Sequence, residues 1–358
     1  MKKHWGKLVA GLVITIVLLW FALNDVDFGE LWANIRGGNP WLLLAAVAVA
    51  TFGFFIRALR WNVLLAPVKP DTRLRSRFAG VSIGFMANNV LPARVGEFAR
   101  AYAFSRMEPV TASAAFGTLV VERFMDGVVL LLFLILPIFS AGFPEGGALS
   151  GGAGGTVLRA GVIAVVIVLL VLIVLAAWPR AFARAAHAVA GYMPKSLSAP
   201  MLAGLDAFLG SITIMRNPKL LALGFLWTLG FWAWHGVSFW LAMLAFDIHT
   251  GFMSAIFTEA LVGFGVALPA APGFFGTFHF SANVALSDVY GVPEAQSLAF
   301  AFGYHFGGWV PITAIGLWYA GKLGLSLGDV GAAEERVERE VGHDTDESVR
   351  PAARPVET

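Results

Sequence analysis

The sequence predicts an all-α polytopic membrane protein, and three observations lead to this fold class. First, 58% of the 358 residues are hydrophobic and 13% are charged, whereas soluble domains carry about 25% charged residues. Second, the mean hydropathy is +0.74. Third, the apolar residues gather in segments close to the roughly 20 residues that a membrane-spanning helix needs. The chain has no cysteine, which excludes disulfides, thiol nucleophiles and zinc–thiolate sites.

Eight apolar segments follow one another along the chain. Two of them, 78–92 and 252–268, reach a proline and then turn polar or glycine-rich. We expect these two to begin re-entrant hairpins with a broken helix, 78–107 and 252–288. The other segments have the length and composition of full spans. These six are residues 8–23, 41–59, 110–139, 157–178, 219–246 and 295–320.

The charges of the short loops predict the orientation, because Lys and Arg are retained on the cytoplasmic side. Lys2 and Lys7 place the N-terminus inside, and the basic stretch 57–77 lies inside as well. The acidic stretch 24–30 falls outside, and Lys322 brings the C-terminus back inside. This path closes only if both interrupted segments enter and leave on the same side of the membrane.

A short repeat links the two halves of the chain. "LPARVGEF" at 91–98 and "LPAAPGFF" at 268–275 share the pattern Leu-Pro-Ala-x-x-Gly-x-Phe. In this alignment Ala271 takes the place of Arg94, and Phe274 that of Glu97. We expect the helices to break at these positions: Pro92, Gly96, Pro269, Pro272 and Gly273.

The repeat suggests a domain organisation. Halves 41–139 and 219–320, linked by 140–218, would run in opposite directions through one membrane domain, 1–321. In secondary transporters such paired Gly- and Pro-interrupted segments mark a binding site near the midplane. Residues 322–358 are charged and poor in apolar residues, so we expect a disordered cytoplasmic tail.

The first interrupted segment carries the densest charge. Arg94, Glu97 and Arg100 are spaced i, i+3, i+6, so in a helix Glu97 lies within reach of both arginines. Asn88 and Asn89 precede the break, where their amides can satisfy backbone groups or meet a ligand. Broken helices persist in a membrane only where protein or water satisfies the backbone, which predicts a polar cavity between the hairpins. A simpler interpretation is an interfacial helix whose arginines contact lipid phosphates without specificity.

A second charged cluster lies inside an apolar segment. "VERFMDG" places Glu122, Arg123 and Asp126 about a dozen residues into 110–139. A charge at mid-membrane costs about 2.5–3.5 kcal/mol, so we expect these side chains to face the protein interior. They would serve either function or, alternatively, a structural ion pair.

Further polar candidates are spread along the chain. Arg57 and Arg60 end the second span, where snorkelling at the membrane edge is the simpler interpretation. Glu259 precedes the second break and His279 follows it. The three histidines of the apolar segments are too far apart in sequence for a metal motif, so no metal ion is expected. They are His235, His279 and His305.

Four pieces of the sequence carry a family resemblance. They are "RALRW" at 57–61, "NNVLPARVGEFARAYAFSR" at 88–106, "ERFMD" at 122–126 and "PGFFGTFH" at 272–279. Together they resemble the transmembrane flippase domain of lysylphosphatidylglycerol synthases and its stand-alone relatives. The resemblance implies a domain that moves lipids with modified headgroups between leaflets. It points to the charged residues of the second and third pieces: Arg94, Glu97, Arg100, Glu122, Arg123 and Asp126.

The last piece departs from the family pattern. The family motif reads Pro-Gly-Gly-x-Gly, then two residues and a glutamate, whereas Phe274 and His279 replace the second glycine and the acid here. The resemblance therefore implies neither a particular headgroup nor proton coupling at this point. The sequence also lacks the aminoacyl-transferase domain of the full-length synthases, so we do not expect this chain to make an aminoacyl lipid.

These observations predict a lipid flippase of the cytoplasmic membrane rather than an enzyme. Its lipid would be a phospholipid or a polyprenyl-phosphate-linked molecule, with Arg94 and Arg100 binding the phosphate. No cofactor is expected, and the basic residues follow loop topology rather than a nucleic-acid interface. Two alternatives stay open: a lipid-modifying enzyme using Glu122, Asp126 or His279, and a lipid-binding accessory of a glycosyltransferase. Such an enzyme partner, or a homodimer, is also open.

Overall fold

A computed structural model describes residues 2–24, 26–140, 142–144, 217–267 and 271–340, with a few isolated residues between 184 and 198. Every regular element in these ranges is a helix, which confirms the all-α prediction. The expected span 157–178, Pro269 and the end of the tail from residue 341 lie outside the described residues.

The first half contains one long helix, a broken pair and a second long helix. Helices α1 (Lys2–Leu23) and α2 (Phe28–Gly37) precede it. The half itself consists of α3 (Pro40–Leu65), α4 (Leu74–Val90), the 3-10 turn η1 (Pro92–Arg94), α5 (Gly96–Ser105), α6 (Ala112–Ile135) and the short turn η2 (Leu136–Phe139).

The second half has the same order of elements. It consists of α10 (Pro218–Ala245), α11 (Phe252–Gly265), the turn η4 (Pro272–Phe274), α12 (Thr277–Asn283) with the π-helical segment η5 (Val284–Val289), and α13 (Glu294–Lys322). Both halves also start alike. Asn39 accepts hydrogen bonds from the backbone of Trp41 at 3.0 Å and of Leu42 at 3.2 Å. Asn217 caps α10 in the same way, and a proline follows each cap.

Three described helices, α3, α10 and α13, are long and apolar enough to cross a membrane. Helix α6 has 24 residues, but it includes the charged cluster at 122–126. Residues 11–23 and 28–37 make a bent pair with an angle of 89°. The total number of spans, the inverted repeat and the inside–outside orientation stay predictions.

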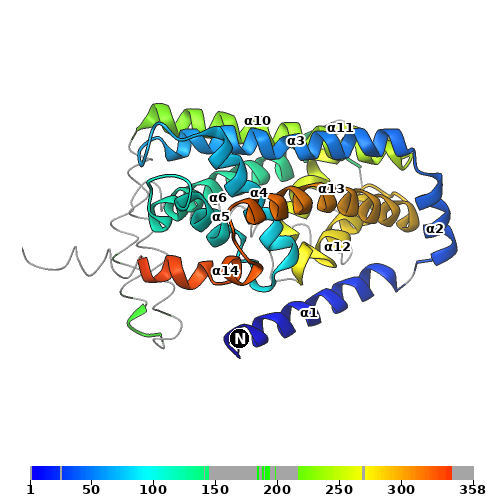
Figure 1. Ribbon diagram of the computed structural model, residues 1–358. Coiled ribbons are helices and arrows are strands. Elements are labelled where there is room, and N and C mark those ends of the chain that lie inside the picture. Colours follow the sequence, from blue (N-terminus) through cyan, green and yellow to red (C-terminus); the bar gives the residue numbers. More distant parts are fainter. Residues whose placement is uncertain are drawn as a thin grey trace, which may run out of the picture.

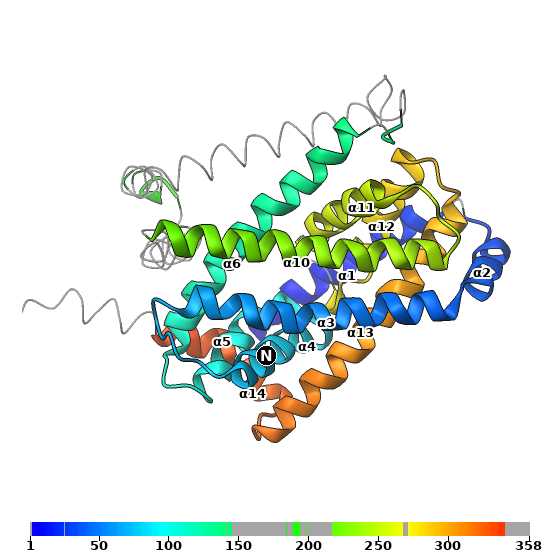
Figure 2. The same ribbon diagram turned by 90° about the horizontal axis from the view of Figure 1, so that it is seen from above.

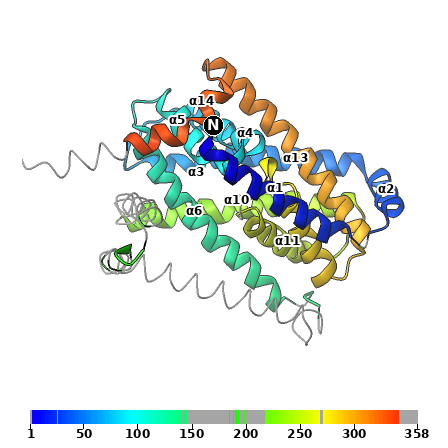
Figure 3. The same cartoon turned by 90° about the horizontal axis from the view of Figure 1, so that it is seen from below.

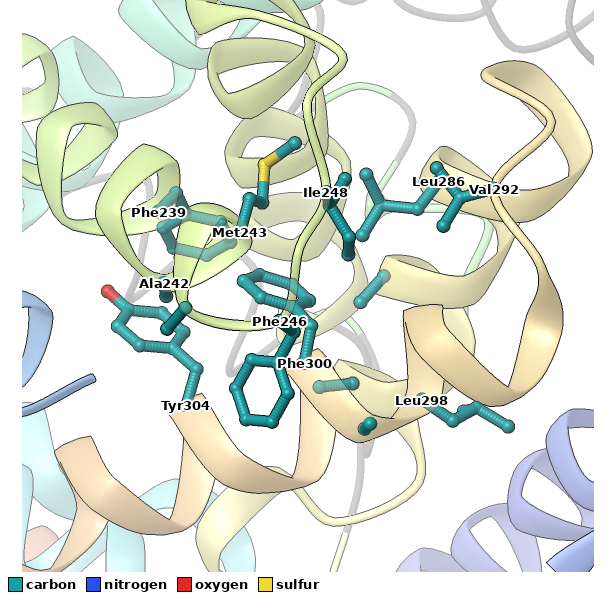
Figure 4. Close-up of a cluster of buried hydrophobic side chains, with 14 of the residues drawn as sticks. Phe239, Ala242, Met243, Phe246, Ile248, Leu286, Val292, Leu298, Phe300 and Tyr304 are labelled. Carbon is teal, nitrogen blue, oxygen red and sulfur yellow. The ribbon is translucent and has the colours of Figure 1, made fainter. Parts of the chain in front are cut away.

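The two long helices α3 and α10 lie side by side along one face of the molecule (Figures 1 and 2). Helix α1 crosses the opposite face (Figures 1 and 3). A hydrophobic cluster joins α10 to α13 near α2, where Phe239, Met243 and Phe300 meet (Figure 4). A second cluster around Trp61 and Phe104 lies at the α5 end.

Both helix breaks end in a left-handed residue, Arg94 with φ 55° and Phe274 with φ 60°. The turn Pro92–Arg94 therefore corresponds in geometry to Pro272–Phe274. The sequence alignment differs from this correspondence by three residues, since it placed Ala271 rather than Phe274 opposite Arg94. Leu, Pro, Ala and Gly are common enough in this chain for a short match to fall out of register.

A glycine lets α5 pack closely on α4. A Cβ at Gly96 would lie 2.2 Å from the carbonyl oxygen of Gly84 and 2.4 Å from the side chain of Asn88. Asn88 accepts a hydrogen bond from the Gly96 backbone at 2.8 Å, which closes the first break. In the second break the glycine has a different task, because Gly273 adopts φ 73°.

The beginning of the tail is ordered, which corrects the expectation of disorder from residue 322. Helix α14 (Leu327–Gly331) and a helical stretch 333–340 follow α13. Val330, Ala333 and Val337 are buried, and Arg336 donates to the hydroxyl of Tyr102 on α5. The spacing of these apolar residues makes one helical stripe, a signal that the charged composition hid.

Candidate functional site

The charged motifs of three helices meet in one buried ion cluster. Glu122 and Asp126 lie one turn apart on α6 and are 0% and 4% exposed. Four arginines surround them, two from α3, one from α5 and one from α6 itself. We call this set the arginine cluster: Arg57, Arg60, Arg100 and Arg123, with Glu122 and Asp126.

Glu122 is the centre of the cluster. Arg100 donates to both of its oxygens, Nη1 to Oε1 at 2.8 Å and Nη2 to Oε2 at 3.0 Å. Arg123 reaches Oε1 at 2.6 Å, Arg60 at 2.8 Å and Arg57 at 3.3 Å. The two parallel bonds from Arg100 are the strong, geometrically specific kind.

Asp126 pairs with three of these four arginines, Arg57, Arg60 and Arg123. Arg60 Nη1 lies 2.5 Å from Oδ1, and Arg123 Nη2 lies 3.0 Å from Oδ2. The indole nitrogen of Trp232 on α10 also donates to Oδ1, at 2.9 Å. This bond fixes the cluster to the second half of the chain.

The cluster holds more positive than negative charge. Four guanidinium groups face two carboxylates, which leaves an excess of two positive charges. In the described part of the chain, the Nε atoms of Arg57, Arg60 and Arg100 are buried without a hydrogen-bond acceptor. Aromatic faces compensate in part, since Arg100 lies 3.9 Å from the ring centre of Trp61. The cluster is therefore short of acceptors and suited to an anion.

A cavity of about 280 Å³, which we call the arginine cavity, opens beside this cluster. Arg123, with 40% of its side chain exposed, is the most accessible member of the cluster. The polar and charged residues that line the cavity are Arg57, Asn88, Arg94, Glu97, Arg100, Arg123 and Asp126.

Glu97 lines the arginine cavity but does not pair with Arg100 as the helical spacing predicted. Arg100 binds Glu122 instead, because a fully buried carboxylate offers it two oxygens at hydrogen-bond distance. Within the described residues no hydrogen bond or ion pair of Glu97 is found.

Arg94 connects the two helix breaks. It donates to the carbonyl oxygen of Ala267 at the end of α11, and its guanidinium lies 5.4 Å from the ring centre of Phe274. Asn89 does not line the arginine cavity. Its side-chain amide instead donates a hydrogen bond to the hydroxyl of Thr313 on α13, at 2.8 Å.

A second cavity, of about 200 Å³, lies against the first, and we call it the aromatic cavity. The two cavities share Arg57, Phe85, Trp232 and Phe274 in their walls. Glu259, 1% exposed, lines the aromatic cavity and lies 2.7 Å from Nδ1 of His235. Further residues of its wall are Asn89, Phe231, Phe239, Phe278, Tyr304, His305 and Trp309.

His279 lies outside the lining of both cavities, contrary to its expected contact with a lipid. Helix α12 directs the ring into aromatic packing, where it lies 4.0 Å from the ring of Phe302 and 5.1 Å from that of His305. Among the described residues, no group of three or more His, Cys, Asp or Glu could hold a metal ion.

Sequence reasoning did not find Trp232 or Trp309. Each is one of 12 tryptophans in an apolar chain, and nothing local marks it. The packing of α10 on α6 brings Trp232 to Asp126, and Trp309 of α13 lines the aromatic cavity. The spacing of Trp232 and His235, three residues apart on α10, is the one signal that pointed to a shared face.

The comparisons with known proteins agree with the family resemblance. The model of the family described as "Lysylphosphatidylglycerol synthase TM region" matches residues 8–316. An archaeal UPF0104 membrane protein of Methanothermobacter thermautotrophicus is 27% identical over 138 residues, 38% of this chain and 40% of that protein. A second one, from Methanocaldococcus jannaschii, is 25% identical over 140 residues, 38% of this chain and 42% of that protein.

A third similar protein is glycosyltransferase AglD of Haloferax volcanii. It is 26% identical over 119 residues, which are 33% of this chain and 19% of that protein. The chain thus matches about two fifths of the length of the UPF0104 proteins and a fifth of AglD.

Proposed function

The chain belongs to the family of the lysylphosphatidylglycerol synthase transmembrane region, and from this premise we propose that it is a lipid translocator. It moves a phosphate-containing lipid between the two leaflets of the cytoplasmic membrane, with the headgroup in the arginine cavity. The acyl chains stay in the surrounding bilayer.

The excess positive charge of the arginine cluster carries this proposal. Uncompensated charge inside a membrane protein is costly, so it usually has a functional partner. A lipid phosphate supplies negative charge and several acceptor oxygens, and arginine binds it through parallel hydrogen bonds. Arg57, Arg100 and Arg123 belong to the cluster and also line the cavity, so a phosphate there meets three of its four cations.

Glu122 and Asp126 have a definite task in this mechanism. They hold the guanidinium groups in place, with Arg123 bridging both carboxylates at 2.6 and 3.0 Å. A phosphate that enters the cavity offers its oxygens to Arg123, which then releases one of the two carboxylates. The exchange of one anionic partner for another keeps the arginines paired while the headgroup crosses. No chemical step is assigned, because arginine donors already engage both carboxylates.

Purified full-length protein in vesicles tests the proposal directly. Acyl-labelled phosphatidylglycerol and acyl-labelled glucosylceramide, which lacks a phosphate, are compared by membrane-impermeant reduction of the label. We expect the protein to expose the inner-leaflet phosphatidylglycerol much faster than empty vesicles do, and to leave glucosylceramide near the empty-vesicle rate. Equal rates with and without protein for phosphatidylglycerol and a polyprenyl phosphate would refute it.

The similarity to glycosyltransferase AglD favours a second candidate. The chain would then bind a lipid-linked sugar and present it to a separate glycosyltransferase without moving it. Saturable binding of a polyprenyl phosphosugar, with no acceleration of its movement in the same vesicles, would select this candidate.

A further inference from the structure

The aromatic cavity has no task in phosphate binding, yet it is built around buried polar groups. Three residues of its wall each have a buried side-chain atom without a hydrogen-bond partner in the part of the chain that the structure describes. These atoms are Oε2 of Glu259, Nδ1 of His305 and Nε1 of Trp309. Buried polar groups normally find a partner, so unmatched ones beside a cavity call for an explanation, of which a bound ligand is one.

We propose that the aromatic cavity is a subsite for an uncharged polyhydroxyl group, a sugar ring or glycerol, attached to the phosphate in the arginine cavity. The proposal rests on the proposed function, whose substrate it narrows to phosphate lipids with hydroxyl-rich headgroups.

The unmatched atoms favour hydroxyl groups over other ligands. The indole of Trp309 only donates, the carboxylate of Glu259 accepts, and the imidazole of His305 does either. A hydroxyl both donates and accepts, so neighbouring hydroxyls of one ligand satisfy all three. The other hydrogen-bonding groups of the wall, such as Tyr304 and His235, extend the same mixed character.

The aromatic rings fit the other face of such a ligand. Phe231, Phe239, Phe278 and Tyr304 line the cavity, and the rings of Phe239 and Tyr304 lie 4.9 Å apart. Aromatic faces carry partial negative charge and attract the partially positive C–H groups of a sugar or glycerol. This wall therefore suits a ligand with polar edges and apolar faces.

A cationic headgroup is the rival ligand, because aromatic rings with a carboxylate also bind ammonium groups. The position of Arg57 decides against it. Its guanidinium lies 4.2 Å from the ring centre of Phe231, so this protein cation already occupies that aromatic face. The excess positive charge of the arginine cluster adjoins the same wall and repels a second cation.

The wall that the two cavities share explains how one ligand can occupy both. Arg57 lines both cavities, so a phosphate bound to it from the arginine cavity can point its substituent into the aromatic cavity. The volumes of about 280 and 200 Å³ are together in the range of ligand sites, about 300–1,000 Å³.

Calorimetric titration of the detergent-solubilised full chain tests the subsite without any transport. The ligands are inorganic phosphate, glycerol 1-phosphate, glucose 1-phosphate and phosphoethanolamine. We expect one or both hydroxyl-rich phosphates to bind about tenfold more tightly than phosphoethanolamine. The glycerol and glucose compounds separate a phospholipid headgroup from a sugar carrier.

Two variants of the cavity wall and a control locate the preference. Glu259→Gln and Trp309→Phe remove one partner each and should lower the tenfold preference towards one. Trp41→Phe, at a residue 78% exposed and outside both cavities, should keep it. Tighter or equal binding of phosphoethanolamine overturns the subsite, as does a preference that neither variant changes. If the preference is found but no lipid moves in vesicles, the subsite stands and the translocator proposal fails.

Discussion

The two broken hairpins have the same sequence of helix, turn and helix but opposite electrostatic character. The first turn ends in Arg94, and its helices adjoin four arginines and two carboxylates. The second ends in Phe274, and the carboxylate on its first helix, Glu259, pairs with a single histidine, His235 of α10. One backbone arrangement thus supports a charged cavity on one side and an aromatic cavity on the other. In our proposal the two cavities bind different parts of one ligand.

The largest expected effect comes from the centre of the charged hairpin's cluster. Glu122→Gln removes the carboxylate that four arginines share, and leaves three uncompensated positive charges instead of two. Breaking a buried ion pair costs about 3–5 kcal/mol, so the melting temperature in detergent should fall sharply. The melting temperature of Glu259→Gln, a variant in the second hairpin, should fall much less. Equal losses would erase the electrostatic contrast between the hairpins.

The contact between the two breaks should contribute less. Arg94→Gln removes a charged donor to Ala267 and the contact with Phe274. A hydrogen bond to a charged group contributes about 1.5–3 kcal/mol, so we expect a moderate loss of stability, together with weaker phosphate binding. Phe274→Leu keeps the donor, so it should lower phosphate affinity less than Arg94→Gln does. Phosphate affinity unchanged in a folded Arg94→Gln protein would remove Arg94 from the site.

Replacing the glycine of each break by alanine should destabilise the protein for a different reason. Gly96→Ala places a Cβ against the Gly84 carbonyl, and overpacking costs roughly 1–3 kcal/mol. Gly273→Ala forces a left-handed alanine, which costs about 1–2 kcal/mol. Gly84→Ala crowds the same contact between α4 and α5, so its loss of stability should not add fully to that of Gly96→Ala. The loss from Gly273→Ala should add fully. Gly127→Ala, with open space around it, is the control. If the stability losses of Gly84→Ala and Gly96→Ala were fully additive in thermal unfolding, the close packing of α4 and α5 would be contradicted.

The smallest effect tests what the two halves have in common. Asn39→Ala and Asn217→Ala each remove two capping hydrogen bonds at the start of a long helix. Loss of such a cap costs about 1 kcal/mol, and we expect the same value in both halves. Clearly unequal values in chemical denaturation would show that the shared order of elements conceals different local stabilities.

The sequence predicts the buried charges well and their partners poorly. Glu122 and Asp126 stand out because charge within an apolar segment is costly wherever the helix goes. Their partners on α3 could not be predicted, since Arg57 and Arg60 also fit the ordinary pattern of a membrane edge. Helical spacing offered Glu97 as the partner of Arg100, but the tertiary contact with Glu122 provides two bonds and greater burial.

The aromatic cavity shows the same limit more strongly. Its tryptophans and phenylalanines are frequent residue types in this chain, and no local pattern separates a cavity wall from a lipid-facing surface. The sequence does mark Glu259, but the neighbour that pairs with it, His235, lies on another helix. The tail shows the converse, because the stripe of Val330, Ala333 and Val337 was present in the sequence. Its charged surroundings favoured disorder instead.

The dependence of lipid movement on Arg123 tests the central claim most directly. Arg123 is the accessible arginine of the cluster, and Arg123→Gln should preserve the fold because 40% of its side chain is exposed. The rate of labelled phosphatidylglycerol movement is measured in vesicles holding equal amounts of wild type, Arg123→Gln and Arg339→Gln, an exposed arginine outside both cavities. We expect the rate with Arg123→Gln to be at least about tenfold lower than with wild type and close to the rate in empty vesicles. The rate with Arg339→Gln should match that of wild type. Wild-type rates in a folded Arg123→Gln protein would contradict phosphate passage through the arginine cavity.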